Sequence, residues 1–123
     1  ELRSAALLGK AVAEDATAFN AFSALEAATL SGARAMGLED RIGSLEPGKQ
    51  ADVIAIDLSQ LEALPMYDVI SQLVYTGARH WVSDVWIAGQ CKLSEHQLQG
   101  MDVERIGADA RRWQQVIARV PRR

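Results

Sequence analysis

The sequence predicts an α+β chain in which helices come first, a small group of strands follows, and an amphipathic helix comes last. Three observations predict this order. Alanine and leucine, both strong helix formers, dominate residues 1–38. Valine and isoleucine cluster from residue 53 onward, which is typical of strands. Near the end, apolar residues recur every three or four positions, the period of a helix. About four strands are expected, and so small a sheet with open edges needs a partner.

The first helix is expected over residues 1–13, followed by a loop over residues 14–20. Its apolar residues fall on one stripe made of Leu2, Ala5, Leu8 and Val12.

A second helix is expected to begin at Ser23, because Glu26 three residues later would complete a capping box. Ser31 and Gly32 are expected to interrupt it, and a short helix then ends with Gly37 in the C′ position. The helix faces are small and apolar, which suits close packing against a larger body.

The strands are expected after the turn at Pro47–Gly48. Residues 53–56 are apolar in succession, which is typical of a strand with both faces covered, and Asp52 and Asp57 bracket it. A hairpin is expected around residues 88–90, with Gly89 as the permissive residue. Regular strand geometry would place three residues on one side of this hairpin: Trp81, Val85 and Ile87.

A short helix is expected between these strands. Pro65 breaks any long helix there, and Asp68 is placed to cap a helix through Leu73.

The last helix is amphipathic and is expected to end at Pro121. Its apolar stripe, with steps of 4, 3, 4 and 3, consists of Ile106, Ala110, Trp113, Ile117 and Val120. Its other face carries Arg111, Arg112, Gln114 and Gln115.

Composition is that of a globular domain of 123 residues with 49 % hydrophobic and 24 % charged residues. The net charge of −3 argues against a nucleic-acid partner. No apolar run reaches about 18 residues, so no membrane partner is expected, and no signal peptide is recognised. Cys91 is the single cysteine, which favours a reducing, cytoplasmic location.

Residues able to hold a metal are few. A catalytic zinc generally needs three protein ligands, and only His80, Cys91 and His96, around the predicted hairpin, could form such a set. We favour surface or core positions for them, with Cys91 buried as a small hydrophobe, and keep the three-ligand cluster as a minor alternative.

The remaining polar groups favour structural interpretations. Paired carboxylates act as acid and base only where their environments separate their pKa values, and three pairs are expected to be solvated or structural: Glu14 with Asp15, Glu39 with Asp40, and Asp52 with Asp57. Nearby acids dilute the C-terminal arginines, so a solvated helix face is favoured for Arg105, Arg111, Arg112, Arg119, Arg122 and Arg123. The tryptophans Trp81, Trp86 and Trp113 are expected to fill the core.

Two stretches carry a family resemblance: "ALEAATLSGARAMGLEDRIGSLEPGKQADVIAID" and "YDVISQLVYTGARHWVSDVWIAGQCKL". Together they resemble the C-terminal part of the amidohydrolase superfamily. The second stretch is similar to the chlorohydrolase/deaminase branch, and within it to the 5-methylthioadenosine/S-adenosylhomocysteine deaminases. The resemblance covers roughly residues 1–120.

The resemblance implies a parent enzyme with a (β/α)₈ barrel and a small β-sandwich built from both chain ends. Such enzymes hold zinc or iron in the barrel, and the metal acidifies a water that displaces an amino or halide group. The resemblance implies three parts here: last helices packing on the barrel (1–38), the C-terminal part of the sandwich (39–97), and a C-terminal helix (98–123).

None of the family's metal, catalytic or substrate-binding residues maps onto this chain by that resemblance, so no site residue of any of these kinds is assigned. The matching residues are scaffold: turn glycines at Gly43 and Gly48, and Asp52 as a strand-start residue with a structural hydrogen bond.

Three readings stay open. The favoured one is the inactive scaffold portion of a metal-dependent hydrolase for non-peptide carbon–nitrogen bonds, or of a dechlorinating enzyme. It predicts the remainder of the parent, or self-association through exposed apolar surface, as partner, and a small-molecule substrate only for the parent. One alternative is a free-standing oligomerisation or interaction module, and the other is a small metal-binding or catalytic domain built on His80, Cys91 and His96.

Overall fold

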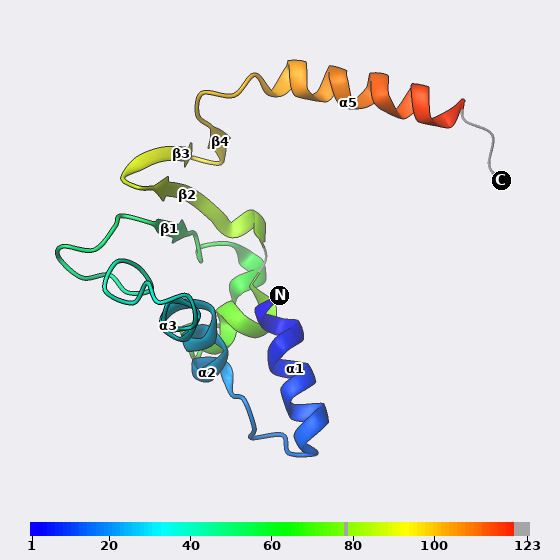
Figure 1. Cartoon of the computed structure of the whole chain (residues 1–123). Helices are drawn as coiled ribbons and strands as arrows, with labels where there is room; N and C mark the ends of the chain where they lie inside the picture. The colour runs from blue at the N-terminus through cyan, green and yellow to red at the C-terminus, as the bar shows by residue number, and fades with distance from the viewer. Residues whose placement is uncertain (78, 120–123) are drawn as a thin grey trace.

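A computed structural model describes residues 1–77 and 79–119. Helices from the first part of the chain gather at one end, a small sheet lies beside them, and the last helix extends away from the sheet (Figure 1). The expectations above that named Val120, Pro121, Arg122 and Arg123 fall outside the described residues.

The first helix, α1 (Leu2–Ala13), confirms the predicted element but buries a different stripe. Ala6 is fully buried, whereas Leu8 and Val12 are 65 % and 77 % exposed. The predicted stripe is therefore wrong beyond Leu2, which is partly buried. The reason is that the neighbouring helices contact α1 on the side of Ala6 and Leu2, so Leu8 and Val12 remain exposed to solvent.

The next helix is continuous through α2 (Ala21–Glu26), the π-helical segment η1 (Ala27–Ser31) and α3 (Gly32–Ala35). The predicted interruption is wrong, because Ser31 and Gly32 both keep right-handed helical backbone angles. The Ser23 capping box is also wrong. Asn20 is the N-cap, and its side-chain oxygen accepts a hydrogen bond from the Ser23 amide at 3.0 Å.

This helix ends as predicted at Gly37, which has a φ of 65°. The Gly37 amide donates to the Arg34 carbonyl and the Leu38 amide to the Ala33 carbonyl. These two bonds form a Schellman motif, which needs a left-handed residue that glycine adopts without strain.

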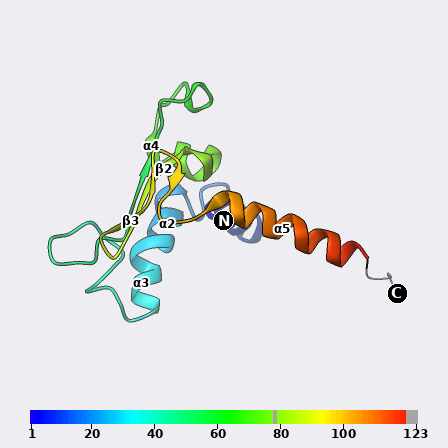
Figure 2. The ribbon, with the colours of Figure 1, turned by 90° about the horizontal axis from the view of Figure 1, so that it is seen from above.

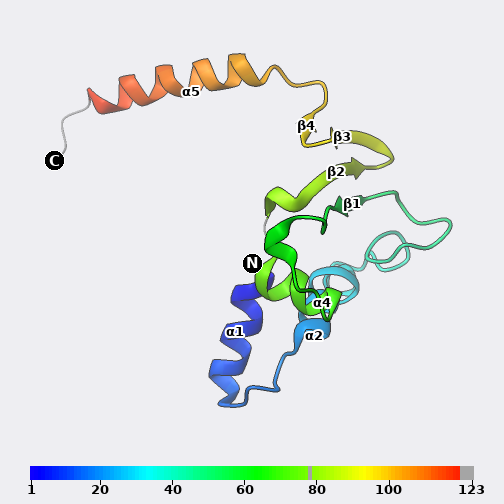
Figure 3. The same cartoon turned by 180° about the vertical axis from the view of Figure 1, so that it is seen from behind.

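The core joins segments that are distant in the sequence. Asp68 caps α4 (Val69–Ser71), as predicted, by accepting from the Ser71 amide at 2.6 Å, and the π-helical segment η3 (Gln72–Thr76) continues it. This helix returns from the strand region to pack against α1 and α2 (Figure 3). The shared cluster consists of Ala6, Ala21, Ala24 and Val74, with Leu2, Ile70 and Tyr75 against it. Two 3₁₀ turns flank it in sequence, η2 (Leu61–Ala63) and η4 (Arg79–Trp81).

The sheet has four antiparallel strands in the order β1-β2-β3-β4: β1 (Val53–Ile56), β2 (Val82–Ile87), β3 (Gln90–Ser94) and β4 (Gln97–Leu98). The predicted strand at 53–56 and the hairpin at 88–90 are confirmed. Two details differ. Ile54 is 54 % exposed, so β1 is not covered on both faces by the described residues. Trp81 lies in η4 before β2 and is buried, while Ile87 is 53 % exposed.

Both hairpins turn through two residues of positive φ, the geometry of type I′ turns. In the β2–β3 turn these are Ala88 (49°) and Gly89 (76°), and in the β3–β4 turn they are Glu95 (47°) and His96 (63°). Asp52 supports the first turn, because its Oδ1 accepts from the Ala88 amide at 2.7 Å. The structural hydrogen-bonding role expected of Asp52 is thereby confirmed.

Asp84 supports the second turn. Its Oδ1 accepts from the Ser94 hydroxyl at 3.0 Å and from the Glu95 amide at 3.2 Å. Hydrogen bonds from Ser83, from Ser94 and from the Glu95 amide lower the pKa of Asp84, because they favour the ionised carboxylate.

The last helix, α5 (Val103–Ala118), begins at Asp102, whose side chain accepts from the Arg105 amide at 2.9 Å. It buries none of its residues, and it extends from the sheet without another element over it (Figure 2). Trp113 is 59 % exposed, so the expectation that this tryptophan fills the core is wrong, whereas Trp81 is buried as expected. None of the helices in the described ranges has the length and apolarity to cross a membrane.

The first prediction concerns the β2–β3 turn. Replacing Ala88 with Asn should stabilise the protein by about 1 kcal/mol, because an alanine in the left-handed region is strained and Asn-Gly is the preferred pair for this turn. Urea unfolding measures the change. Gly89→Ala is the opposing control, since it adds strain at a φ of 76°, and it should destabilise. Equal midpoints for Ala88→Asn and the wild type would contradict the prediction.

The second prediction concerns acid sensitivity of the β3–β4 turn. Because folding lowers the pKa of Asp84, its stabilising effect is present above the pKa of the unfolded chain, about 4, and is lost as the pH falls through the folded value. Amide exchange at Glu95 should therefore accelerate below about pH 4, after correction for intrinsic rates. Asp84→Asn should abolish this pH dependence, and an unchanged profile in that variant would refute it.

Candidate functional site

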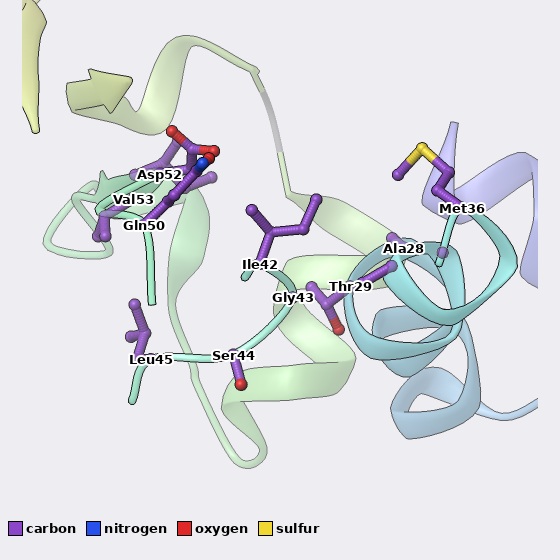
Figure 4. Close-up of a pocket in the computed structure, with 13 residues that line it drawn as sticks. Ala28, Thr29, Met36, Ile42, Gly43, Ser44, Leu45, Gln50, Asp52 and Val53 are labelled. Carbon is purple, nitrogen blue, oxygen red and sulfur yellow. The ribbon is translucent and has the colours of Figure 1, made fainter. Parts of the chain in front are cut away.

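An apolar cavity of about 370 Å³ lies between the helix η1–α3 and strand β1 (Figure 4). The loop that precedes β1 closes one side of it. The cavity is lined by Ala28, Thr29, Gly32, Ala33, Met36, Ile42, Gly43, Ser44, Leu45, Gln50, Asp52, Val53 and Ile54.

Small residues let the helix and loop approach closely at this cavity. A Cβ at Gly43 would lie 2.8 Å from the Ala33 Cβ, closer than real Cβ atoms come, and a tight 3.1 Å from the Thr29 carbonyl oxygen. Gly43 also has a φ of 93°. Its role therefore extends beyond that of a turn glycine, because both its backbone angle and its contact with the helix require the missing side chain.

A second cavity of about 320 Å³ continues along β1 toward Trp81. It shares Ala28, Thr29 and Ile54 with the first, so the two form one surface, called the trough below. The Trp81 indole nitrogen is buried without a hydrogen-bond partner among the described residues. A buried indole N–H normally finds an acceptor, and no described residue supplies one to Trp81.

The polar groups around the trough form hydrogen bonds with the loop and the sheet that line it. The Lys49 ammonium donates to the Glu39 carbonyl and to the Ser44 hydroxyl, both at 2.6 Å. A hydrogen bond from Ser44 and the charge of Lys49 lower the pKa of Glu46. Asp52 is bound to the Ala88 amide across the sheet. These contacts fix the loop and leave the trough itself apolar.

The other carboxylates act as acceptors in turns and caps. Hydrogen bonds from Thr17 lower the pKa of Asp15, those from Ser59 and Gln60 lower the pKa of Asp57, and those from Ser71 lower the pKa of Asp68. A general acid at neutral pH needs a raised pKa instead. The expectation of solvated pairs holds for both adjacent pairs, since Glu14, Asp15, Glu39 and Asp40 are exposed.

The three possible metal ligands do not come together. His80 lies edge-on to Trp81, Cys91 lies on β3, and His96 lies in the β3–β4 turn. Among residues 1–77 and 79–119, no group of three His, Cys, Asp or Glu side chains could hold a metal ion. The geometry therefore does not support the minor alternative of a His80, Cys91 and His96 site.

Cys91 corrects a second expectation. Its side chain is exposed and not buried, because it lies on the part of β3 that no helix covers, and its Sγ contacts the Leu93 carbonyl at 3.2 Å.

The trough is lined mainly by apolar side chains, and the described residues include no group of three metal ligands. Sequence reasoning did not find it, because its residues come from a helix, a loop and a strand that are separated along the chain. The signals that could have indicated it are the small residues Ala28, Gly32 and Ala33 and the turn glycine Gly43.

Known proteins share this architecture and much of this sequence. A model of the amidohydrolase family matches residues 1–92. The 5-methylthioadenosine/S-adenosylhomocysteine deaminase of Teredinibacter turnerae is 51 % identical over 117 residues, which are 95 % of this chain and 26 % of the relative. The protein of the same name from Saccharophagus degradans is 46 % identical over 114 residues, covering 93 % of this chain and 26 % of the relative.

Solved structures agree with the fold. An adenosine deaminase from Xanthomonas campestris with bound zinc superposes with a TM-score of 0.91 and 55 % identity, over 98 % of this chain and 27 % of that one. An atrazine chlorohydrolase from Arthrobacter aurescens complexed with zinc superposes with a TM-score of 0.79 and 28 % identity, over 89 % of this chain and 24 % of that one.

The chain spans about a quarter of the length of the relatives it matches. The family match over residues 1–92 and the close superposition on a solved relative lead to one conclusion: this chain belongs to the amidohydrolase family.

Proposed function

We propose that this chain is the C-terminal scaffold portion of a metal-dependent hydrolase that deaminates an adenosine-type substrate, and that the active site lies in the rest of that polypeptide. One observation carries the proposal. Nearly the whole chain aligns with deaminases while covering about a quarter of each, and its described residues contain no metal cluster.

The substrate class follows from the relatives. Deaminases of 5-methylthioadenosine and S-adenosylhomocysteine match this chain at 51 % and 46 % identity, whereas the zinc-bound atrazine chlorohydrolase matches at 28 %. Deamination is therefore favoured over dechlorination. A zinc or other divalent ion would be held outside this chain. A single exposed thiol, Cys91, fits a reducing cytoplasmic compartment.

The parts of the chain would have separate roles in that polypeptide. Residues 1–38 would pack on a barrel, residues 39–97 would supply the C-terminal part of a sandwich, and residues 98–123 would form a terminal helix. The trough supports this arrangement, because an unfilled apolar surface beside an edge strand is suited to a covering partner.

The third prediction tests catalysis. The complete polypeptide encoded by this reading frame should release ammonia from 5′-methylthioadenosine or S-adenosylhomocysteine, lose that activity to a chelator and regain it with zinc. The 123-residue chain should be inactive. Steady-state ammonia release with each substrate measures both.

Within that polypeptide, His80→Ala, Cys91→Ser and His96→Ala should leave kcat/KM within about twofold. Even loss of a group behind a metal ligand costs about 10- to 100-fold. A loss of that size in any of the three, or stoichiometric zinc bound by the chain alone, would overturn the assignment of the active site to the rest of the polypeptide.

The fourth prediction tests the trough. The isolated chain should self-associate through it, so its sedimentation coefficient should rise with concentration. Ile54→Lys places a charge in the shared part of the trough and should reduce this association. Leu61→Lys is the matched control, because Leu61 is 81 % exposed and lies outside the trough. An equal effect of both variants, or a monomer at every concentration, would contradict the prediction.

A further inference from the structure

The helix α5 has the construction of a docking element, but nothing in the described chain covers it. Five apolar residues follow one another at steps of three, four, three and four: Val103, Ile106, Ala110, Trp113 and Ile117. The four large ones are 54 % to 67 % exposed. All five fall on a narrow stripe, the spacing by which one helix packs lengthwise against another.

The helix also needs a partner for its own stability. It has 16 residues, which is close to the length at which isolated helices are marginal in water. Gly107 in its interior and several β-branched residues weaken it further. Its arginines lie on the outer face, and Arg112 pairs there with Asp109 at 3.3 Å.

A second copy of α5 is a poor candidate for that partner. A stable interface between separate molecules uses roughly 20–30 residues a side, whereas α5 offers one stripe of five. In a coiled coil, the flanking e and g positions supply the ion pairs. Here these positions are Gly107, Asp109, Gln114 and Val116, which cannot form opposite-charge pairs between two identical helices.

A partner within the same polypeptide removes this difficulty. Covalent linkage makes docking intramolecular, so a small apolar stripe is sufficient. The superposition on the solved Xanthomonas relative extends over 98 % of this chain, which includes most of α5. It covers 27 % of that relative, so the remaining 73 % of the relative lies beyond the matched part. The orientation of α5 is therefore shared with a much longer chain that has ample surface to cover it.

We propose that α5 is a latch whose stripe packs lengthwise on one helix in the part of the polypeptide that lies outside this chain. The inference rests on the proposed membership in a longer enzyme and adds a second contact surface to the trough. In Figure 1, α5 continues from β4, whereas α3 and β1, which line the trough, lie at the other edge of the sheet. The latch would therefore hold the sheet to the body from the edge opposite the trough.

Hydrogen exchange on the complete polypeptide tests the latch. The amides of residues 103–118 should exchange on the order of 100-fold more slowly there than in the isolated chain, because docking protects them. Ile106→Glu places a charge in the stripe and should return their exchange to the rate of the isolated chain. Gln115→Glu is the matched control, because Gln115 lies on the opposite face of α5 and should leave protection unchanged.

The test has one folding control and two outcomes that would overturn the latch. Retained protection of α1 and α2 in Ile106→Glu shows that the variant is folded. If the protected species has the mass of two polypeptides and the protection of α5 disappears on dilution, a second copy covers α5 and the latch is overturned. Unprotected α5 amides in the complete polypeptide would also overturn it. None of these readouts depends on deamination, so failure of the latch is distinguishable from failure of the proposed activity.

Discussion

The connection between the start of β1 and the β2–β3 turn is the contact on which the sheet and the trough depend. The Asp52 carboxylate accepts from the Ala88 amide, and the Ala51 carbonyl accepts from the Gly89 amide at 3.0 Å. These bonds hold a turn that includes a strained alanine. They also fix β1 against β2, and β1 is the strand that forms one wall of the trough. The family-like stretch around Asp52 thus has a structural role, consistent with its lack of chemistry.

The core of the chain is made mainly of small side chains. Of the seven buried hydrophobic residues within 1–77 and 79–119, five are alanines, and the other two are Val74 and Trp81. Alanines allow close helix packing but remove little apolar area from water. Many large apolar residues are exposed instead, among them Leu8 of α1, Ile54 of β1 and Trp113 of α5. An exposed surface of this kind is typical of a binding face. The trough and α5 are two places where this chain has one.

The fold and the site lead to different conclusions about chemistry. The fold belongs to a family whose solved relatives hold zinc, while the described residues of this chain place His80, Cys91 and His96 apart. Under the proposed function, catalysis would lie in another part of the polypeptide and this chain would support it. The support is specific, because Gly43 permits a close contact that a side chain would prevent.

The sequence by itself determined the local features whose causes lie within a few residues. These include the cap at Asp68, the helix end at Gly37, the strand at 53–56 and the hairpin around Gly89, because backbone angles and nearby hydrogen bonds decide them. Tertiary structure decided which side of α1 is buried, that the helix passes Ser31 and Gly32 without a break, and that Cys91 is exposed. It alone assembled the trough, since burial and cavities depend on which distant segments meet, and helical periodicity identifies an apolar stripe without identifying what covers it.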